Sequence, residues 1–331
     1  MVLNFQHKAK VILAGTAAVL SLSALSGPLW AQTASWPTKT IRLVVGFAPG
    51  GGTDVMARVV AQGLSEALGT TVIVDNRPGA SGNLAASEVV RAAPDGYALM
   101  VAPTSVATAN PMLFKANFTP SRDLTPIGSI GMTAMYVVGK PGSTVKNARE
   151  LVDFGKANPG KLSYASSGAG TPPHLAAELF KLRTGIFATH IPYRGSAPAL
   201  QDVMAGQADY VFDPGIAFPH IRSGKVKLLG VASAKRSPFF PEMPTLAEQG
   251  IQGAEMDIWF GMWAPNGMPP EVIARLNREL AKVLALPAVK ERFAGLGAEP
   301  AALDQTAFRK LLRDEERVVT TLVKTQKIVV D

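Results

Sequence analysis

The chain has 331 residues, no cysteine and a formal net charge of +8 at pH 7. Without cysteine it can form neither disulfides nor thiolate metal sites, and it cannot carry the lipid of a bacterial lipoprotein. The basic residues are scattered and no nucleic-acid-binding motif accompanies them, so nucleic acid is not an expected partner. A chain of this length, of which 47% is hydrophobic, can bury a large core and is expected to form two domains.

Residues 1–31 have the features of a secretory signal peptide. A short basic start with Lys8 and Lys10 precedes an apolar run over 11–25, and small residues lead up to Ala31. The apolar run is too short to span a bilayer, since a membrane helix needs roughly 20 residues. We therefore expect cleavage after Ala31 or Ala34 and export of the mature chain to the periplasm. An uncleaved membrane anchor is the alternative.

From residue 39 onward, segments typical of strands and helices alternate. The pattern predicts strands at 41–45, 71–74 and 98–101, with helices at 54–68 and 84–92 between them. This β-α-β-α-β order predicts an α/β domain with a mainly parallel sheet.

A second α/β unit is expected after a hinge or turn at 139–142. Its predicted helices are 147–157, 174–184 and 197–205, and its predicted strands are 162–165, 189–192, 208–212 and 226–232. A strand at 258–264 is expected to return to the first domain, followed by helices at 270–284 and 304–324. The predicted division is thus 36–138 with 257–331 as domain 1 and 139–256 as domain 2, joined by short crossings that suit hinge motion. No internal sequence repeat can be aligned.

The segment 46–54 follows the first predicted strand and is the first candidate for ligand binding. Ligands of open α/β sheets bind beyond the carboxyl ends of the strands. Three consecutive glycines, 50–52, let the backbone approach a ligand, and the helix that follows presents free N–H groups and a partial positive charge that suit a carboxylate or phosphate. The spacing matches neither a P-loop nor a dinucleotide-binding fingerprint. A tight turn with Thr53 as the helix cap is the alternative.

Four further segments follow predicted strands and carry small or hydroxyl-bearing residues: 103–105, 166–174, 193–196 and 213–215. The segment 166–174 has the same character as the first loop, with small residues, hydroxyl groups and a helix start. Two helix N-termini that face each other from two domains would hold an anion between them. Any one segment alone can be a simple turn, but their recurrence at successive strand ends favours a ligand-binding cleft.

The sequence contains no recognisable catalytic motif. It has no zinc-protease His-Glu-x-x-His, no G-x-S-x-G elbow and no paired-carboxylate motif. A triad of Ser167, His220 and Asp213 is an alternative that only the residue types support. His174 is interpreted as a first-turn helix residue with a local hydrogen bond. We expect no catalytic residue, no metal and no cofactor.

Eight short motifs occur in order along the mature chain: FAPGGGTD (47–54), NRPGASG (76–82), PDGY (94–97), YRG (193–195), GQAD (206–209), SAKRSP (233–238), PTLAE (244–248) and WFG with AP (259–265). Through these motifs the whole chain from about Trp36 resembles the Bug family of periplasmic solute-binding receptors. These TctC-like proteins are the extracytoplasmic component of tripartite tricarboxylate transporters.

The resemblance implies a two-domain α/β periplasmic-binding-protein fold of the Venus-flytrap, type II-like class, with a ligand cleft between the domains. It implies capture of a small carboxylate, held by backbone N–H groups and ordered water rather than by an arginine, and its delivery to membrane permease subunits. A membrane sensor kinase is the alternative partner, and a monomer is expected. The matching loops imply a ligand-binding set consisting of Phe47, Ala48, Gly52, Thr53, Thr104, Ser105, Ser167, Gly168, Thr171, His174, Tyr193, Gly195 and Asp213.

One departure from the family pattern lies after Phe212 and Asp213, where the pattern has Asn and an apolar residue but this chain has Pro214 and Gly215. The change stiffens or reshapes the loop at the far end of the ligand. The ligand of other members is therefore not transferred to this chain. Dicarboxylates, tricarboxylates, aromatic acids, amino acids and nicotinic-type acids all stay open.

Overall fold

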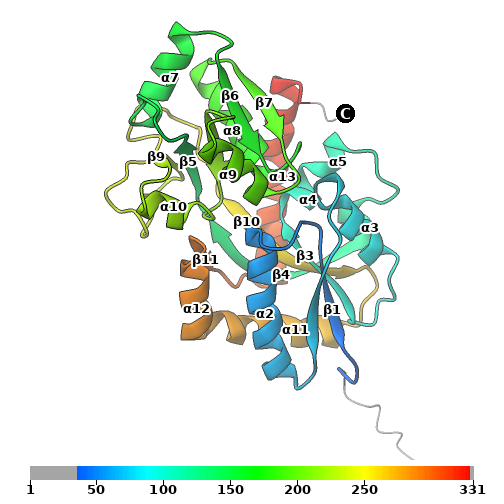
Figure 1. Cartoon of the computed structure of the whole chain (residues 1–331). Helices are drawn as coiled ribbons and strands as arrows, with labels where there is room; N and C mark the ends of the chain where they lie inside the picture. The colour runs from blue at the N-terminus through cyan, green and yellow to red at the C-terminus, as the bar shows by residue number, and fades with distance from the viewer. Residues whose placement is uncertain (1–35, 329–331) are drawn as a thin grey trace, which may run out of the picture. The chain divides into compact units, whose positions relative to one another are not determined.

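The computed structural model describes residues 36–328 and contains two β-sheets with helices packed around them (Figure 1). The sheets and helices all lie in one compact unit that begins at Lys39. The predicted signal peptide, 1–31, lies outside the described residues. Within those residues, no helix is both long enough and apolar enough to cross a bilayer.

The first sheet has six strands in the order β11-β4-β10-β3-β1-β2. Strand β1 pairs in parallel with β2 and β3, whereas β10 is antiparallel to both of its neighbours, β3 and β4. The parallel β-α-β-α-β unit predicted from residue 41 onward is therefore confirmed. The expectation of a mainly parallel sheet is wrong, because β10 pairs antiparallel with β3 and β4, and β11 pairs antiparallel with β4. The strands are β1 (Ile41–Val45), β2 (Val72–Asn76), β3 (Ala98–Pro103), β4 (Leu124–Thr133), β10 (Ile258–Pro265) and β11 (Ala298–Pro300).

The helices that accompany this sheet come from both ends of the chain. Helix α2 ends where Gly69 adopts a left-handed conformation with φ of 65°, which glycine tolerates without strain. The helices are α2 (Gly52–Leu68), α3 (Asn83–Val90), α4 (Ser105–Thr108), α5 (Asn110–Leu113), α6 (Pro120–Asp123), α11 (Pro270–Ala285), α12 (Pro287–Ala294) and α13 (Gln305–Gln326), with a 3-10 turn η2 (Ala80–Gly82).

The second sheet has five strands in the order β7-β6-β8-β5-β9. Strand β6 pairs in parallel with β7 and β8, whereas β5 is antiparallel to β8 and β9. The strands are β5 (Met135–Gly139), β6 (Leu162–Ser166), β7 (Ala188–Pro192), β8 (Tyr210–Asp213) and β9 (Lys227–Ala232). The helices are α7 (Ala148–Ala157), α8 (Pro172–Thr184), α9 (Ser196–Met204) and α10 (Phe218–Arg222).

The placement of β5 corrects one expectation. The segment 136–138 was expected to leave the first domain, with a hinge at 139–142, but β5 pairs with β8 and β9 in the second sheet. The chain therefore passes from the first sheet to the second at Ala134, between β4 and β5. An apolar strand carries the same local signal in either sheet, so only its long-range pairing decides where it belongs.

Both sheets share one topology that the sequence does not reveal as a repeat. The first contains the order β2-β1-β3-β10-β4 and the second is β7-β6-β8-β5-β9. In each, the antiparallel strand is the first strand after the chain has crossed from the other sheet. These strands start beside the carboxyl ends of their neighbours, since Tyr136 pairs with Asp213 at the end of β8 and Phe260 pairs with Pro103 at the end of β3.

The core that joins α13 to the first sheet gives a test of this packing. Phe308 is completely buried and its ring centroid lies 5.3 Å from that of Trp263 on β10. Phe308→Ala should lower the free energy of unfolding by about 3–5 kcal/mol, because it removes buried apolar contacts and leaves a cavity. Urea denaturation of the chain without its predicted signal peptide measures the loss.

Phe187→Ala is the matched control, because the ring of Phe187 is 58% exposed. It should change the free energy of unfolding by less than about 1 kcal/mol. Equal losses in the two variants would contradict the role given to Phe308.

Candidate functional site

The glycine-rich loop between β1 and α2 is held in shape by the carboxylate of Asp54. This carboxylate accepts hydrogen bonds from the backbone N–H of Gly50 at 2.9 Å, from Arg58 at 3.0 Å and from Asn76 at 2.9 Å. Asn76 also donates to the carbonyl of Phe47 at 3.0 Å. Burial acts to raise the pKa of Asp54, but these hydrogen bonds outweigh it and hold the pKa below its ordinary value. An ionised, buried carboxylate thus fixes the backbone that leads into α2.

Three helices begin beside this loop. Helix α2 starts after Gly51, α8 after Thr171 and α9 after Gly195, and none of these N-cap residues makes a side-chain cap hydrogen bond. The first N–H groups of a helix have no partner within it and carry a partial positive charge. Helix α8 begins with Pro172 and Pro173, which have no N–H to offer. Helices α2 and α9 are therefore the better anion binders.

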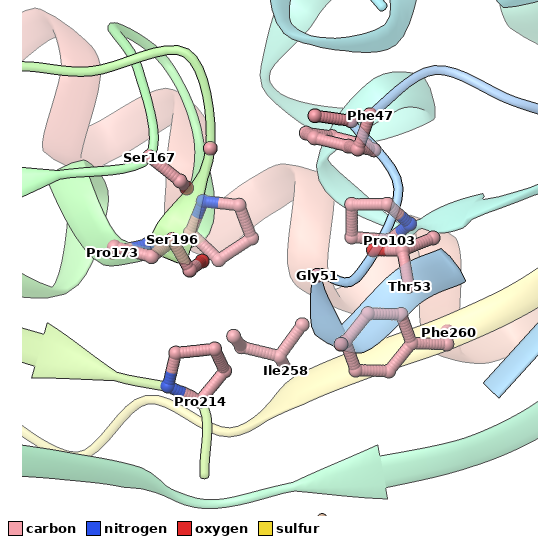
Figure 2. A pocket seen from close by; sticks show the side chains of 14 residues that line it. Phe47, Gly51, Thr53, Pro103, Ser167, Pro173, Ser196, Pro214, Ile258 and Phe260 are labelled. Atoms are coloured by element: carbon pink, nitrogen blue, oxygen red, sulfur yellow. The ribbon is translucent and has the colours of Figure 1, made fainter. Parts of the chain in front are cut away.

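A pocket that opens to solvent lies where these helices start (Figure 2). Figure 2 shows Ser167, Pro173 and Ser196 on one wall and Phe47, Pro103 and Thr53 on the other, with Pro214, Ile258 and Phe260 below them. None of the fourteen described residues that line this pocket has a charged side chain. The others in this lining are Ala48, Gly51, Gly52, Pro172 and Gly195.

The structure brings part of the predicted set together in this pocket, namely Phe47, Ala48, Gly52, Thr53, Ser167 and Gly195. Gly168 and Tyr193 line an adjacent cavity of about 1130 Å³ that shares Phe47, Ala48 and Ser167 with the pocket. The hydroxyl of Tyr193 donates to Asp202, and burial together with this carboxylate raises the pKa of Tyr193 to about 12.

Thr104 and Ser105 lie elsewhere, in a third cavity of about 1410 Å³. This cavity is lined largely by α13, by residues 255–257 and by the first two residues of β10, Ile258 and Trp259. The backbone N–H of Thr104 donates to the carbonyl of Trp259 at 2.9 Å. It shares Pro172 and Ile258 with the pocket of Figure 2, whereas Thr104 and Ser105 line this cavity and not the pocket.

His174 lies behind the loop after β6 and lines none of these cavities. Its Nδ1 accepts the backbone N–H of Gly170 at 2.9 Å, so the predicted local hydrogen bond is confirmed. Its ring stacks on His190, with centroids 4.0 Å apart, and His190 is hydrogen-bonded to Ser166 at 2.6 Å. Burial lowers the pKa of His174 to about 4 and that of His190 to about 3, so both rings are neutral near pH 7.

Thr171 also supports this loop from within. Its hydroxyl donates to the carbonyl of Gly168 at 2.6 Å and accepts the hydroxyl of Ser167 at 3.0 Å. Thr171 is 1% exposed. Together with the His174 bond, these contacts set the conformation of the loop while only Ser167 reaches the pocket of Figure 2.

The NRPGASG motif connects the loops of the two sheets. Ala80 and Ser81 adopt positive φ angles of 46° and 52°, a conformation that costs energy in residues other than glycine. The Ser81 hydroxyl donates to the carbonyl of Ala169 in the loop after β6, and Asn110 donates to the carbonyl of Ser81 at 3.0 Å. The strained turn is therefore fixed from both sides and touches the opposite wall of the site.

Asp213 is buried at the end of β8 with its side chain directed into its own loop. Its Oδ1 accepts the backbone N–H groups of Gly215 at 2.8 Å and Ala217 at 2.9 Å. Its Oδ2 is buried and has no hydrogen-bond partner among the described residues. Burial raises the pKa of Asp213 to about 6. Ser167 donates to Thr171, and no described hydrogen bond joins it to Asp213 or His220 as a triad would require.

Several pocket residues were not in the predicted set: Gly51, Pro103, Pro172, Pro173, Ser196, Pro214, Ile258 and Phe260. All of these except Ile258 and Phe260 lie in segments that the sequence singled out, so their strand-end position was a usable signal. Ile258 and Phe260 were missed because they lie at the start of a strand. They reach the pocket because β10 is antiparallel to β3.

The raised pKa of Asp213 predicts a pH-dependent stability. In the unfolded chain this carboxyl ionises near its ordinary pKa of 3.8, but in the native state near 6. Between these values the native state binds more protons, so stability falls as pH rises from about 4 to about 6, by up to about 3 kcal/mol for a shift of two units. Asp213→Asn should remove this contribution.

Urea denaturation at a series of pH values measures the effect as the difference between the two proteins. Asp153→Asn is the control, since the side chain of Asp153 is 61% exposed. A difference between the protein and Asp213→Asn that stays constant over this pH range would contradict the prediction.

Comparison with known proteins gives the family. A family model described as "Tripartite tricarboxylate transporter family receptor" matches residues 56–328. The protein BugT of Bordetella pertussis is 36% identical over 304 residues, which cover 89% of this chain and 91% of BugT.

Solved structures share both sequence and fold. The periplasmic binding protein BugD superposes with a TM-score of 0.83 at 35% identity, over 89% of this chain and 99% of BugD. A Rhodopseudomonas palustris protein solved with adipate superposes with a TM-score of 0.85 at 33% identity, over 89% of this chain and 99% of that protein. MatC of the same species, with bound malate, superposes with a TM-score of 0.82 at 30% identity, over 87% of this chain and 100% of MatC.

These likenesses cover nearly the whole chain and confirm the α/β periplasmic-binding-protein fold. That fold and family are those of solute-binding proteins, which are not enzymes. The chain therefore belongs to the tripartite tricarboxylate transporter receptors, the TctC or Bug family of periplasmic solute-binding proteins.

Proposed function

We propose that this protein captures a small carboxylate in the pocket of Figure 2 and delivers it to the permease of a tripartite tricarboxylate-type transporter. The observation that carries the proposal is that α2, which packs with the first sheet, and α9, which packs with the second, both begin at one pocket whose described lining has no charged side chain. The relatives solved with adipate and malate support a carboxylate as the ligand.

The pocket offers a carboxylate hydrogen-bond donors in place of a cationic side chain. A carboxylate that leaves water needs partners for its oxygens, because burying it without them is costly. Free N–H groups at the starts of α2 and α9 supply such partners, and the helix dipoles add a favourable field. The hydroxyls of Thr53, Ser167 and Ser196 line the same space.

In this proposal the two sheets are the cores of two domains that close on the ligand. The first domain comprises β1 to β4 with β10 to α13, and the second comprises β5 to β9, with the first boundary at Ala134 instead of 138. A ligand that contacts both domains only when they are closed shifts the population toward that form. The bond from Ser81 to Ala169 is a contact that closure would make.

The export of the chain belongs to the same proposal. Residues 1–31 direct the protein across the inner membrane and are removed, so that the receptor acts in the periplasm, where its relatives act. The closed, ligand-bound monomer then docks on membrane permease subunits.

A thermal-shift panel of adipate, malate, hexanoate and benzoate tests the proposal on the chain without its signal peptide. A ligand at 100 times its dissociation constant should add about 2.7 kcal/mol to the stability of the folded state. A panel without any shift, with protein shown to be folded and free of ligand, would contradict carboxylate binding.

For an acid that binds, Ser196→Ala should raise the dissociation constant by about 10- to 100-fold, since a hydrogen bond to a charged group contributes about 1.5–3 kcal/mol. Isothermal titration calorimetry measures the change. Ser223→Ala is the matched control, because Ser223 is exposed at the end of α10 and does not line the pocket. Equal effects of the two variants would place the ligand elsewhere.

A further inference from the structure

We infer that the pocket of Figure 2 selects a monocarboxylate with an apolar body, alkyl or aromatic, over a dicarboxylate of the same carbon skeleton. This inference rests on the proposed function and names the substrate class of that same site. It follows from how the hydrogen-bond donors and the apolar side chains are distributed around the pocket.

The donors suffice for one carboxylate. Of the three helices that begin here, α8 starts with Pro172 and Pro173, so the two positions that would face a second anion lack N–H groups. Helix α2 keeps its first N–H groups, and α9 keeps those of Ser196 and Ala197 before Pro198, so Thr53 and Ser196 lie at the two helix starts that can donate. One carboxylate between α2 and α9 uses these donors.

The loop after β8, at the floor of the pocket, does not replace the missing donors. Pro214 has no N–H, and the N–H groups of Gly215 and Ala217 are taken by the Oδ1 of Asp213. The carbonyl of Pro214 in turn accepts the hydroxyl of Thr133 at 2.8 Å. The loop therefore presents the pyrrolidine ring of Pro214 to the pocket. The N–H groups of Gly215 and Ala217 and the carbonyl of Pro214 form hydrogen bonds within the protein.

A buried carboxyl group next to this floor is also unfavourable for an anion. Asp213 precedes Pro214 in the chain and is buried, and its Oδ2 has no partner among the described residues. Arg194, exposed, lines the adjacent cavity beyond Phe47 and is the one charged side chain in the described lining of either space. A second carboxylate on the floor would therefore lose its water without gaining a cation.

The floor instead fits an apolar body. Ile258 and Phe260 are each 3% exposed, and Figure 2 shows Ile258 between Pro214 and Phe260. Pro103 and Phe47 extend this apolar surface up one wall. Aromatic and aliphatic groups gain free energy from burial against such side chains, and the rings of Phe47 and Phe260 can also pack against an aromatic ligand.

Titration calorimetry with matched pairs of acids tests the inference. Hexanoate is compared with adipate, and benzoate with terephthalate, so that each pair differs by one carboxylate. The monocarboxylate of each pair should bind at least about 10-fold more tightly, because the second charge must be desolvated without donors. Pro214→Asn adds a backbone N–H and a side-chain amide at the floor. It should reduce the ratio of the dicarboxylate's dissociation constant to that of the monocarboxylate several-fold.

Ile258→Thr is a second variant that places a hydroxyl on the floor without touching the loop, and it should narrow the ratio in the same direction. Thermal unfolding shows whether each variant is folded. Pro219→Asn is the control for Pro214→Asn, since Pro219 is exposed on α10, and it should leave the ratio unchanged.

Dicarboxylates that bind as tightly as their monocarboxylate partners would overturn the inference and leave the proposed function standing. If Arg194→Ala then removed that binding, the second carboxylate would lie in the adjacent cavity. A ratio that neither floor variant changes would overturn the assignment of selectivity to the floor. Binding of no acid of either kind would overturn both this inference and the proposed function.

Discussion

The hydrogen bonds accepted by the buried carboxylate of Asp54 decide where α2 begins, and the rest of the site depends on that point. The carboxylate ties down the glycine loop through Gly50, and Asn76 joins it to the carbonyl of Phe47. A loop with three consecutive glycines has a large conformational entropy to lose, so a fixed geometry needs such an anchor. Because the anchor is ionised and internal, the first N–H groups of α2 remain free to face the pocket.

The shared topology of the two sheets explains why the pocket lies where it does. Each sheet takes its antiparallel strand from the chain just after a crossing, and that strand starts beside the carboxyl ends of parallel neighbours. The loops that bind ligands in α/β sheets and the segments that cross between sheets are thereby brought to the same edge. Ile258 and Phe260 are pocket residues for this reason, although they lie at the start of a strand instead of following one.

Local patterns in the sequence predicted most of the elements and the glycine loop, because periodicity and strand-end chemistry are local properties. They failed where long-range pairing decides, as for β5, whose residues 136–138 suit either sheet. They also failed to separate residues that touch the ligand space from those behind it. Thr171 and His174 occupy the expected loop, but their side chains bond inward to Gly168 and Gly170. Thr104 follows β3 as expected, yet its side chain faces the cavity beside α13.

No cationic side chain is among the described residues that line the pocket, and this has a consequence for closure under the proposed function. An arginine would hold a carboxylate on one domain alone, with both oxygens satisfied by one side chain. Here the donors are divided, with α2 and Thr53 on one wall and α9 and Ser196 on the other. A carboxylate bound to one wall alone keeps an oxygen without a protein partner, and water must supply it. The ligand therefore gains its full set of hydrogen bonds only when both walls approach it, and this difference in binding free energy between the two forms is what drives a population shift.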